Sequence, residues 1–236
     1  MLIYAKTHQG LIRANNQDSL LIAHSTYGVA DGMGGHKGGE TASRVAVQVM
    51  KNALAGKQPE EQALRIGFEA ANRRVYEMQL HDPNLSGMGT TLTLLWEGEN
   101  EVLVGHVGDS RAYLLRDGEL NQQTEDHSIV AELVRNHVIT PEMALKHPYR
   151  SVITRALGTD ARVMPDILHV EKQLGDIWLV CSDGLYNMVD DATLLEVLTS
   201  MENEQATEKL LSLANEHGGH DNISLVVGRV TGGDAI

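Results

Sequence analysis

Short apolar runs rich in β-branched residues recur along this 236-residue chain and predict strands. Two pairs of runs are joined by turn-like sequence, namely Asp117-Gly118, a strong hairpin signal, and the polar stretch 97–101. Because hairpins dominate the connections, we expect the sheets to be largely antiparallel. The predicted strands cover 27–30, 90–96, 102–107, 111–116, 119–124, 177–182 and 223–230.

Other segments place apolar residues at helical spacing. A first helix is predicted over 39–54, with Val45, Val49 and Ala53 on one face, and Pro59 opens a second. Shorter helices are expected at 129–136, from Pro141, at 194–201 and at 206–217. Helices packed outside antiparallel sheets predict an α+β fold. The apolar face of the second helix carries Leu64, Phe68, Ala71, Val75 and Met78.

Composition narrows the class of protein. With no internal repeat and no obvious linker, we expect one domain over residues 1–236. The single cysteine, the absence of a secretory signal and the short apolar runs favour a cytoplasmic protein without a membrane span. The formal net charge of −13 argues against a nucleic-acid partner. An acidic protein that handles phosphate needs local positive charge, which bound cations would supply.

Four aspartates share one setting, at the end of a predicted strand beside a glycine or a turn. They are Asp31, Asp109, Asp183 and Asp221. A carboxylate there can point into a shared cleft while the strand holds it rigidly, and carboxylate oxygens suit Mg²⁺ and Mn²⁺. Asp-Gly is also a common turn, and at Asp117-Gly118 we accept only the hairpin interpretation. Four carboxylates that converge on one cleft predict a two-metal site.

Other candidate chemistry is weaker. The glycine-rich run 32–39 matches neither the dinucleotide-binding nor the Walker pattern, and a tight turn beside a metal fits it better. Arg13 could bind phosphate oxygens through its planar fork, although its position alone favours a surface ion-pair residue. We expect Arg111 to brace the site, and Cys181 to be a buried strand residue without a Cys-x₅-Arg phosphate loop. For His36, His127 and His220 we expect surface or supporting roles.

Taken in order, these segments closely resemble the protein phosphatase 2C (PPM) family in its compact bacterial form. The resemblance spans nearly the whole chain, and the ordered set is far more specific than any one motif. It looks most like the stand-alone phosphatases that oppose bacterial Ser/Thr kinases. The matching segments are Arg13-x-x-Asn16-Gln17-Asp18, Val29-Ala30-Asp31-Gly32-Met33-Gly34-Gly35-His36, Gly87-Met88-Gly89-Thr90-Thr91, Gly108-Asp109-Ser110-Arg111, Glu125-Asp126-His127-Ser128, Ala156-Leu157-Gly158, Cys181-Ser182-Asp183-Gly184-Leu185 and Asp221-Asn222-Ile223.

The resemblance implies a four-layer α-β-β-α sandwich, in which two antiparallel sheets are flanked by helices and the metal centre lies in a cleft at one edge. It implies that Asp31 bridges two Mn²⁺ or Mg²⁺ ions, one of them also held by the Gly32 carbonyl. Asp183 and Asp221 would hold the other ion, and Asp109 with Asp183 would form a weaker third site. These five residues are the expected metal ligands.

The resemblance assigns supporting roles as well. Arg13 matches the phosphate-binding arginine, and with Asp31 it forms the expected catalytic pair. Asp18, Gln17 and Asn222 are expected just outside the metal ligands. The segment 127–150 would be a flap over the cleft.

The expected activity is hydrolysis of phosphoserine and phosphothreonine on other proteins, by in-line attack of a metal-bridging hydroxide. Met33 and Gln17 stand where animal members carry a histidine and a glutamate. No side chain is therefore assigned as proton donor, and a metal-bound water is one candidate. The expected partners are phosphorylated proteins, including a cognate Ser/Thr kinase, and the expected state is a monomer. Two alternatives stay open: a non-catalytic phosphoprotein-binding regulator of the same fold, and another two-metal hydrolase such as a nuclease.

Overall fold

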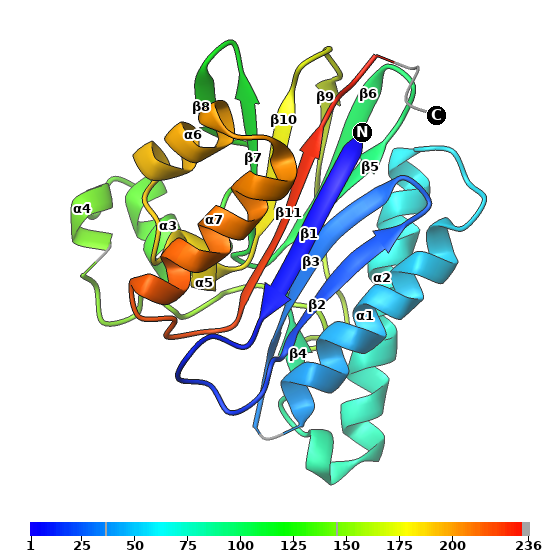
Figure 1. The fold of residues 1–236 in the computed structure, drawn as a ribbon. Coiled ribbons are helices and arrows are strands. Elements are labelled where there is room, and N and C mark those ends of the chain that lie inside the picture. The colour runs from blue at the N-terminus through cyan, green and yellow to red at the C-terminus, as the bar shows by residue number, and fades with distance from the viewer. Residues whose placement is uncertain (36, 145, 233–236) are drawn as a thin grey trace.

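A computed structural model describes residues 1–35, 37–144 and 146–232. Two sheets whose strand pairs are all antiparallel lie face to face (Figure 1). The first sheet has the order β1 (Leu2–His8), β11 (Ile223–Arg229), β10 (Ile177–Cys181), β7 (Arg111–Arg116) and β8 (Glu119–Gln122). The second has the order β2 (Asp18–Ala23), β3 (Thr26–Met33), β5 (Leu92–Glu97), β6 (Glu101–Val107) and β9 (Asp166–Glu171), with β4 (Gly89–Thr90) beside β3.

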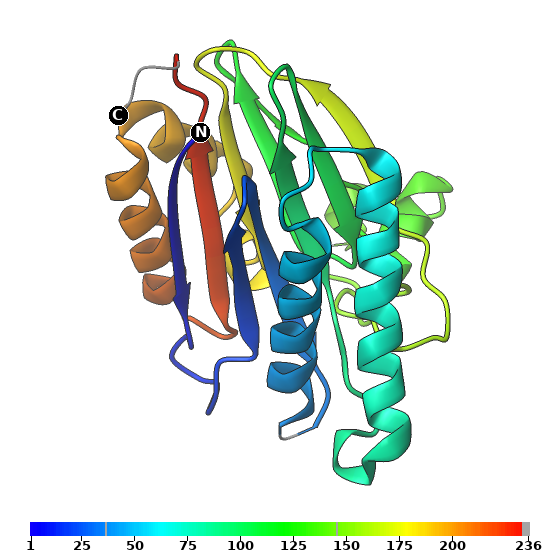
Figure 2. The same cartoon turned by 90° about the vertical axis from the view of Figure 1, so that its right-hand side faces the viewer.

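Helices cover the outer face of each sheet, so that four layers are stacked in the side view (Figure 2). The second sheet is covered by α1 (Gly38–Leu54) and α2 (Glu61–His81), which the 3₁₀ turn η1 (Pro83–Leu85) follows. The first is covered by α5 (Asp183–Tyr186), α6 (Asp191–Ser200) and α7 (Asn203–Glu216). Two short helices, α3 (Ile129–Arg135) and α4 (Pro141–Ala144), stand apart from these layers. None of the described helices is long and apolar enough to cross a membrane.

Three apolar clusters hold the layers together. Phe68 and Trp96 belong to the cluster between α1, α2 and the second sheet. Trp178 belongs to the cluster between the two sheets, and Leu210 to the one beneath α7. Each of these side chains is fully buried. Burial of large apolar side chains is the dominant stabilising contribution to folding, so these clusters fix the sheets against each other.

The predicted α+β sandwich is confirmed, but the prediction missed strands β1, β2 and β9. All three are edge strands with mixed burial, so they lack a clean apolar pattern. The predicted inner face of α1 is shifted, because Ala46 and Met50 are fully buried while Val45 and Val49 are only partly buried. The second helix begins at Glu61 rather than Pro59, with its predicted face turned inward. The Asp117-Gly118 hairpin is confirmed, and both residues have positive φ.

Strand pairing carries all four strand-end aspartates to one end of the sandwich. β3 and β6 both run antiparallel to β5, so Asp31 near the end of β3 and Asp109 after β6 leave the sheet in the same direction. β10 is antiparallel to β11, so Asp183 after β10 lies near Asp221, which precedes β11. The topology therefore gathers residues that are far apart in the sequence.

Candidate metal centre

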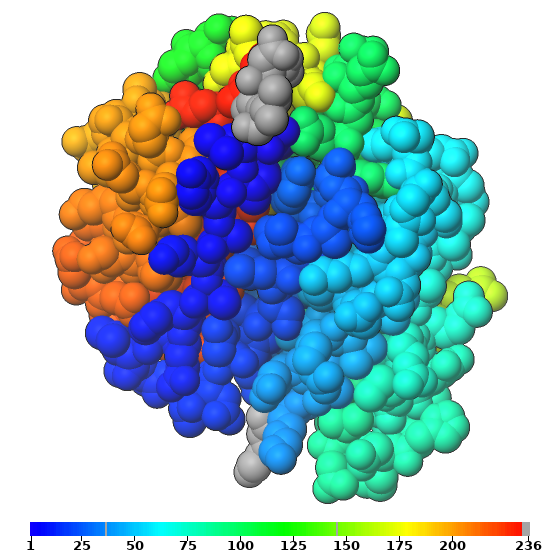
Figure 3. All heavy atoms as spheres, turned by 45° about the vertical axis from the view of Figure 1, so that its right-hand side comes forward, coloured from blue at the N-terminus to red at the C-terminus, as the bar shows by residue number. Residues whose placement is uncertain are grey.

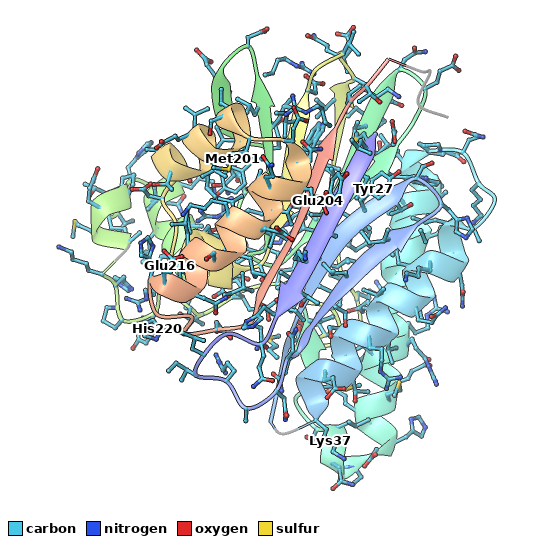
Figure 4. All side chains as sticks on the ribbon, in the orientation of Figure 1. Tyr27, Lys37, Met201, Glu204, Glu216 and His220 are labelled. Carbon is cyan, nitrogen blue, oxygen red and sulfur yellow. The ribbon has the colours of Figure 1, made fainter. Side chains whose placement is uncertain are left out.

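A cavity of about 300 Å³ lies at this end of the sandwich. His220, which directly precedes Asp221, marks this end in Figure 4. The four strand-end aspartates, the predicted phosphate ligand Arg13 and the apolar Met33 all face one space. The lining residues are Arg13, Gln17, Asp31, Gly32, Met33, Gly34, Thr91, Asp109, Ser151, Ile153, Asp183, Asp221 and Asn222.

Asp31 is held in place through its backbone. Its N–H donates to Thr91 Oγ1 at 2.9 Å, and its carbonyl accepts from Thr91 N–H at 2.9 Å and from Thr90 Oγ1 at 2.8 Å. Thr91 Oγ1 is in turn 2.7 Å from Ser110 Oγ. A strand end fixed by these bonds leaves the carboxylate little freedom to move away from the cavity.

Gly32 stands where the end of β3 meets the start of α1. A Cβ on Gly32 would lie 2.1 Å from the Gly39 carbonyl oxygen and 2.6 Å from that of Gln17. The Gly32 N–H donates to the Gln17 carbonyl at 3.2 Å. Only glycine permits this close approach, which places the peptide of Gly32 at the cavity wall beside Asp31.

The backbone of Asp109 is held by a side chain from α5. Its carbonyl accepts a hydrogen bond from the Tyr186 hydroxyl at 3.0 Å. The Arg111 guanidinium carbon lies 3.7 Å from the centre of the Tyr186 ring, and Arg111 also makes a two-pronged ion pair with Asp126, with N–O distances of 2.9 and 2.7 Å. Arg111 thus braces the site, as predicted, and does not line the cavity.

Asp183 is the first residue of α5. The residue before it, Ser182, makes buried hydrogen bonds. The Ser182 hydroxyl donates to Asp18 Oδ2 at 2.8 Å and accepts from the Ser224 N–H at 3.0 Å. Asp183 Oδ2 accepts from the Asn187 amide at 3.2 Å. These bonds connect the ends of β2, β10 and β11 around the acidic cluster.

Asp221 faces Arg13 across the mouth of the cavity. Arg13 Nη2 lies 2.7 Å from Asp221 Oδ2, and the other oxygen of Asp221 accepts the Asn222 N–H at 2.8 Å. The Arg13 side chain is 54% exposed and Asp221 is 33% exposed. The pair with Asp221 raises the pKa of Arg13. Arg13 is therefore a fixed positive charge with much of its guanidinium open to an incoming anion.

Asn222 fastens the loop that carries Arg13. Its Oδ1 accepts the Gln17 N–H at 2.8 Å, and its Nδ2 donates to the carbonyls of Gln9 and Asn15 at 2.9 Å each. The N-terminal segment lies between the C-terminal helices and α1 (Figure 3). One buried side chain from the far end of the sequence thus sets the position of the Arg13 loop.

The cavity concentrates carboxylates whose negative charge bound cations would stabilise. Burial raises the pKa of the Asp31 carboxyl well above its ordinary value, and the neighbouring charges of Asp18 and Asp183 raise it further. Burial likewise raises the pKa of Asp183 and of Asp109. Like charges that are crowded out of water disfavour the ionised state, and bound divalent ions reverse that effect.

The residues present fit hard divalent ions. Among the described residues, four buried side-chain polar atoms have no hydrogen-bond partner, and two of them are Asp18 Oδ1 and Asp183 Oδ1 at this site. Carboxylate and carbonyl oxygens are the ligands that Mg²⁺ and Mn²⁺ prefer. In the part of the chain described, no three acidic, His or Cys side chains stand at metal-binding distance of one point. The carboxylates repel one another, and Asp221 is paired with Arg13 at 2.7 Å.

The predicted flap begins after β8. In the described helices α3 and α4 no residue is buried. The cavity is lined by Ser151 and Ile153, just beyond the predicted limit of the flap at residue 150. Two charged flap residues make contacts within the molecule: Glu132 accepts a hydrogen bond from the Thr154 hydroxyl, and Arg135 pairs with Glu125 at 2.8 Å.

Sequence reasoning placed most of the cavity residues but missed several supports. Asp31, Gly32, Asp109, Asp183, Asp221, Arg13, Gln17 and Asn222 all line the cavity, and Asp18 lies behind it. The Thr91 and Tyr186 contacts were not predicted, because hydroxyl groups in apolar segments give no distinct signal. His36 lies outside the described residues. Cys181 is fully buried in β10, as predicted.

The chain is similar in sequence to known protein phosphatases. The profile of the family described as protein phosphatase 2C matches residues 12–216. The chain is 42% identical over 229 residues to the serine/threonine protein phosphatase PstP of Mycobacterium tuberculosis, covering 96% of this chain but 44% of that protein. It is 36% identical to the serine/threonine phosphatase stp of Listeria monocytogenes, covering 94% of this chain and 93% of that protein. The chain thus spans less than half the length of the mycobacterial relative.

Solved structures agree with the sequences. The crystal structure of the Mycobacterium tuberculosis phosphatase PstP/Ppp matches with a TM-score of 0.93 at 40% identity, over 98% of this chain and 99% of that one. A structure of the PstP catalytic domain in complex with two manganese ions matches with a TM-score of 0.90 at 39% identity, over 98% of each chain. The fold therefore has well-matched counterparts among solved structures.

Proposed function

This chain belongs to the protein phosphatase 2C family, and from that premise we propose that it is a metal-dependent phosphatase of phosphoserine and phosphothreonine in proteins. One observation carries the proposal: four strand-end aspartates share one cavity with an exposed arginine, and two buried carboxylate oxygens there have no partner. We propose that residues 1–236 act as a single catalytic domain.

The proposed metal ligands are aspartates and one backbone carbonyl. Asp31 would bridge two Mn²⁺ or Mg²⁺ ions, the Gly32 carbonyl would complete one of them, and Asp183 with Asp221 would hold the other. Asp109 would hold a weaker third ion together with Asp183. When bound, these ions supply the Lewis acidity that brings the pKa of a water towards about 7 and neutralises charge on the phosphoryl group. The manganese in a relative at 39% identity supports this choice of metal.

Arg13 orients the substrate. Its exposed guanidinium can make two parallel hydrogen bonds to phosphate oxygens, which fixes the phosphorus for in-line displacement. Asn222 keeps the Arg13 loop in register with the aspartates through its bonds to Gln9, Asn15 and Gln17. Asp18 and Gln17 lie next to the metal ligands and shape the polar surroundings of the site.

The alternatives fit less well. A non-catalytic regulator has no use for a complete set of carboxylates whose crowding raises their pKa values. A nuclease would need a basic face for the nucleic-acid backbone, and the chain has a net charge of −13. Phosphorylated proteins, among them a cognate Ser/Thr kinase, are therefore the proposed substrates. We propose that the protein acts as a monomer in the cytoplasm.

A turnover assay tests the proposal. The protein is stripped with a chelator, supplied with Mn²⁺ or Mg²⁺, and given a phosphothreonine peptide, a small aryl phosphate and a supercoiled plasmid. Metal-dependent release of phosphate with an intact plasmid is the expected result. Binding of the phosphopeptide without turnover would favour the regulator, and plasmid cleavage would favour the nuclease.

A further inference from the structure

His127 is the first residue of the flap (127–150) and contacts both Gly108, next to Asp109, and Asp166 in β9. Its ring Nδ1 accepts the Gly108 N–H at 3.0 Å, and its backbone N–H donates to the Gly108 carbonyl at 2.8 Å. On the other side of the ring, Nε2 lies 3.0 Å from Asp166 Oδ2. One imidazole thus connects the residue before Asp109 with the first residue of β9.

The two ring contacts fix the tautomer. Because Nδ1 accepts a hydrogen bond from Gly108, the ring proton must sit on Nε2, from which it donates to Asp166. The His106 ring packs against that of His127, with ring centres 4.6 Å apart, and is itself fully buried. The His127 ring is therefore held in place by packing and in orientation by two different partners.

The residues before and after His127 in the sequence make similar contacts. Asp126 acts towards Asp109, and Ser128 acts within the flap. Asp126 pairs with Arg111, which lies over Tyr186, and Tyr186 donates to the Asp109 carbonyl. Ser128 caps α3 by accepting the Ala131 N–H at 3.2 Å. The Asp109 peptide is thus held from both sides by the segment that begins the flap.

The return of the flap meets the same residue. The His127 carbonyl accepts the Thr154 N–H at 2.7 Å, and Ser128 pairs with Ile153 in an isolated β-bridge. Asp166, the partner of Nε2, also receives Arg155 at 2.7 Å through its other oxygen. The two ends of the flap therefore meet at His127.

We propose that His127 is a positioning residue that couples the flap to Asp109, so that its Nδ1 side sets the Asp109 metal ligand and its Nε2 side, through Asp166 and Arg155, sets the segment on which the flap ends. The proposal deepens the proposed function and rests on it where it concerns the metal held by Asp109. Groups that orient metal ligands from behind typically change metal affinity by about 10- to 100-fold when they are removed.

Two near-isosteric variants separate the two sides of the ring. The amide oxygen of His127→Asn falls near Nδ1 and can still accept from Gly108, but nothing reaches Asp166. The longer side chain of His127→Gln reaches the position of Nε2 and can still contact Asp166, but leaves the Gly108 N–H without an acceptor. A merely structural role for His127 predicts that both variants behave alike.

The experiment measures Mn²⁺ binding by titration calorimetry and amide hydrogen exchange in both variants. His127→Gln is expected to lose protection at Gly108 and to weaken the weakest Mn²⁺ site about 10- to 100-fold, while α3 exchanges as in wild type. His127→Asn is expected to keep the Gly108 protection and the Mn²⁺ affinity, with faster exchange in α3. The control is His169→Gln, which removes a histidine–carboxylate contact towards the other end of β9.

The opposite results overturn the proposal. Equal Mn²⁺ affinities for the two variants, or an unchanged Gly108 amide in His127→Gln, would show that the ring has no directional role. An Asp109→Ala background sharpens the test, since His127→Gln should then cause no further loss of Mn²⁺ binding. These measurements need no turnover, so a wild-type protein without phosphatase activity would contradict the proposed function while the test of His127 could still be made.

Discussion

Two acidic regions of this molecule differ in what they can bind. The candidate metal centre is a cavity of about 300 Å³ at one end of the sandwich. At the opposite ends of β6 and β9 lies a larger cavity of about 470 Å³, which we call the distal pocket. The distal pocket is lined by Gln58, Pro59, Gly98, Glu99, Asn100, Glu101, His169 and Glu171.

Two carboxylates of the distal region, Glu61 and Glu101, already have basic partners. Glu61, at its edge, pairs with Arg65 at 2.8 Å, and His169 lies 3.0 Å from Glu101 and 3.4 Å from Glu61. Glu61, Glu101 and His169 are each more than 40% exposed, so water also solvates them. Hydrogen bonding from Arg65 lowers the pKa of Glu61, the reverse of the shift at Asp31.

The difference indicates that a larger volume and the presence of acidic residues do not by themselves identify a candidate metal site. What distinguishes the candidate metal centre is that Asp31, Asp109 and Asp183 are crowded and removed from water, and that Asp18 and Asp183 each have an oxygen without a hydrogen-bond donor. Such an arrangement is unfavourable by itself and becomes favourable with a cation. Exposed ion pairs like those of the distal region contribute little in either direction.

The largest effect should come from removing metal. Chelator-treated protein is expected to lose phosphopeptide hydrolysis down to background, because neither the nucleophile nor the phosphoryl charge is then stabilised. Activity should return on addition of Mn²⁺ or Mg²⁺. Phosphate release is the measurement, and full activity in the stripped protein, with metal content checked by mass spectrometry, would rule out the two-metal proposal.

Asp31→Asn should come next. Loss of the bridging charge is expected to lower kcat more than about tenfold at saturating metal, since both ions and the attacking water depend on it. Relief of like-charge repulsion should at the same time raise the melting temperature of the metal-free protein. Glu101→Gln in the distal region is the matched control, which should leave kcat unchanged and should not raise the melting temperature. An Asp31→Asn enzyme with more than about a tenth of wild-type turnover would remove Asp31 from the bridging role.

Arg13→Ala should raise KM and leave kcat nearly unchanged, because Arg13 binds the phosphate similarly in the ground state and the transition state. A charge-assisted contact is worth about 1.5–3 kcal/mol, which corresponds to about a 10- to 150-fold rise in KM. The control is Arg65→Ala, which breaks an arginine–glutamate pair of similar length in the distal region. A large fall in kcat at constant KM would instead place Arg13 in the chemical step.

Asp109→Ala should have a smaller effect. If Asp109 holds a third, weakly bound ion, its loss shifts the metal-activation curve and reduces phosphoprotein turnover, while Asp31 and Asp221 still hold the first two ions. A metal titration on a phosphoprotein and on a small aryl phosphate measures both. Identical curves for the variant and wild type on both substrates would leave Asp109 as a structural strand-end residue.

The smallest effect is expected in the distal region. Hydrogen bonds to Glu101 and Glu61 raise the pKa of His169. Its stabilisation is therefore fully present below the unfolded pKa of about 6.5 and is lost as pH rises through the folded pKa. His169→Gln should lower the free energy of unfolding by less than about 1 kcal/mol near pH 5.5, as is usual for exposed pairs, and not at all near pH 9. Urea unfolding at the two pH values checks this, and an equal loss at both would exclude the ion-pair explanation.

How far the site could be predicted depended on the kind of residue. The aspartates could be found because each follows or precedes an apolar strand beside a turn, a pattern fixed by local sequence. Asn222 could be placed near them through the resemblance, but not its bonds to Gln9 and Asn15 more than 200 residues away. Thr91 and Tyr186 were missed because a hydroxyl acquires a role only from what the fold sets opposite it.

The sequence by itself determined the central strands, the two long helices and the identity of the acidic residues, because apolar periodicity and strand-end turns are local properties. Only the tertiary structure decided which ends of the strands coincide, since that follows from pairing between β3, β5 and β6 and between β10 and β11. It also decided that edge strands β1, β2 and β9 exist, because pairing rather than pattern makes them strands. The acidic crowding at the cavity is likewise tertiary: each aspartate is an ordinary turn residue until folding removes it from water among others of the same charge.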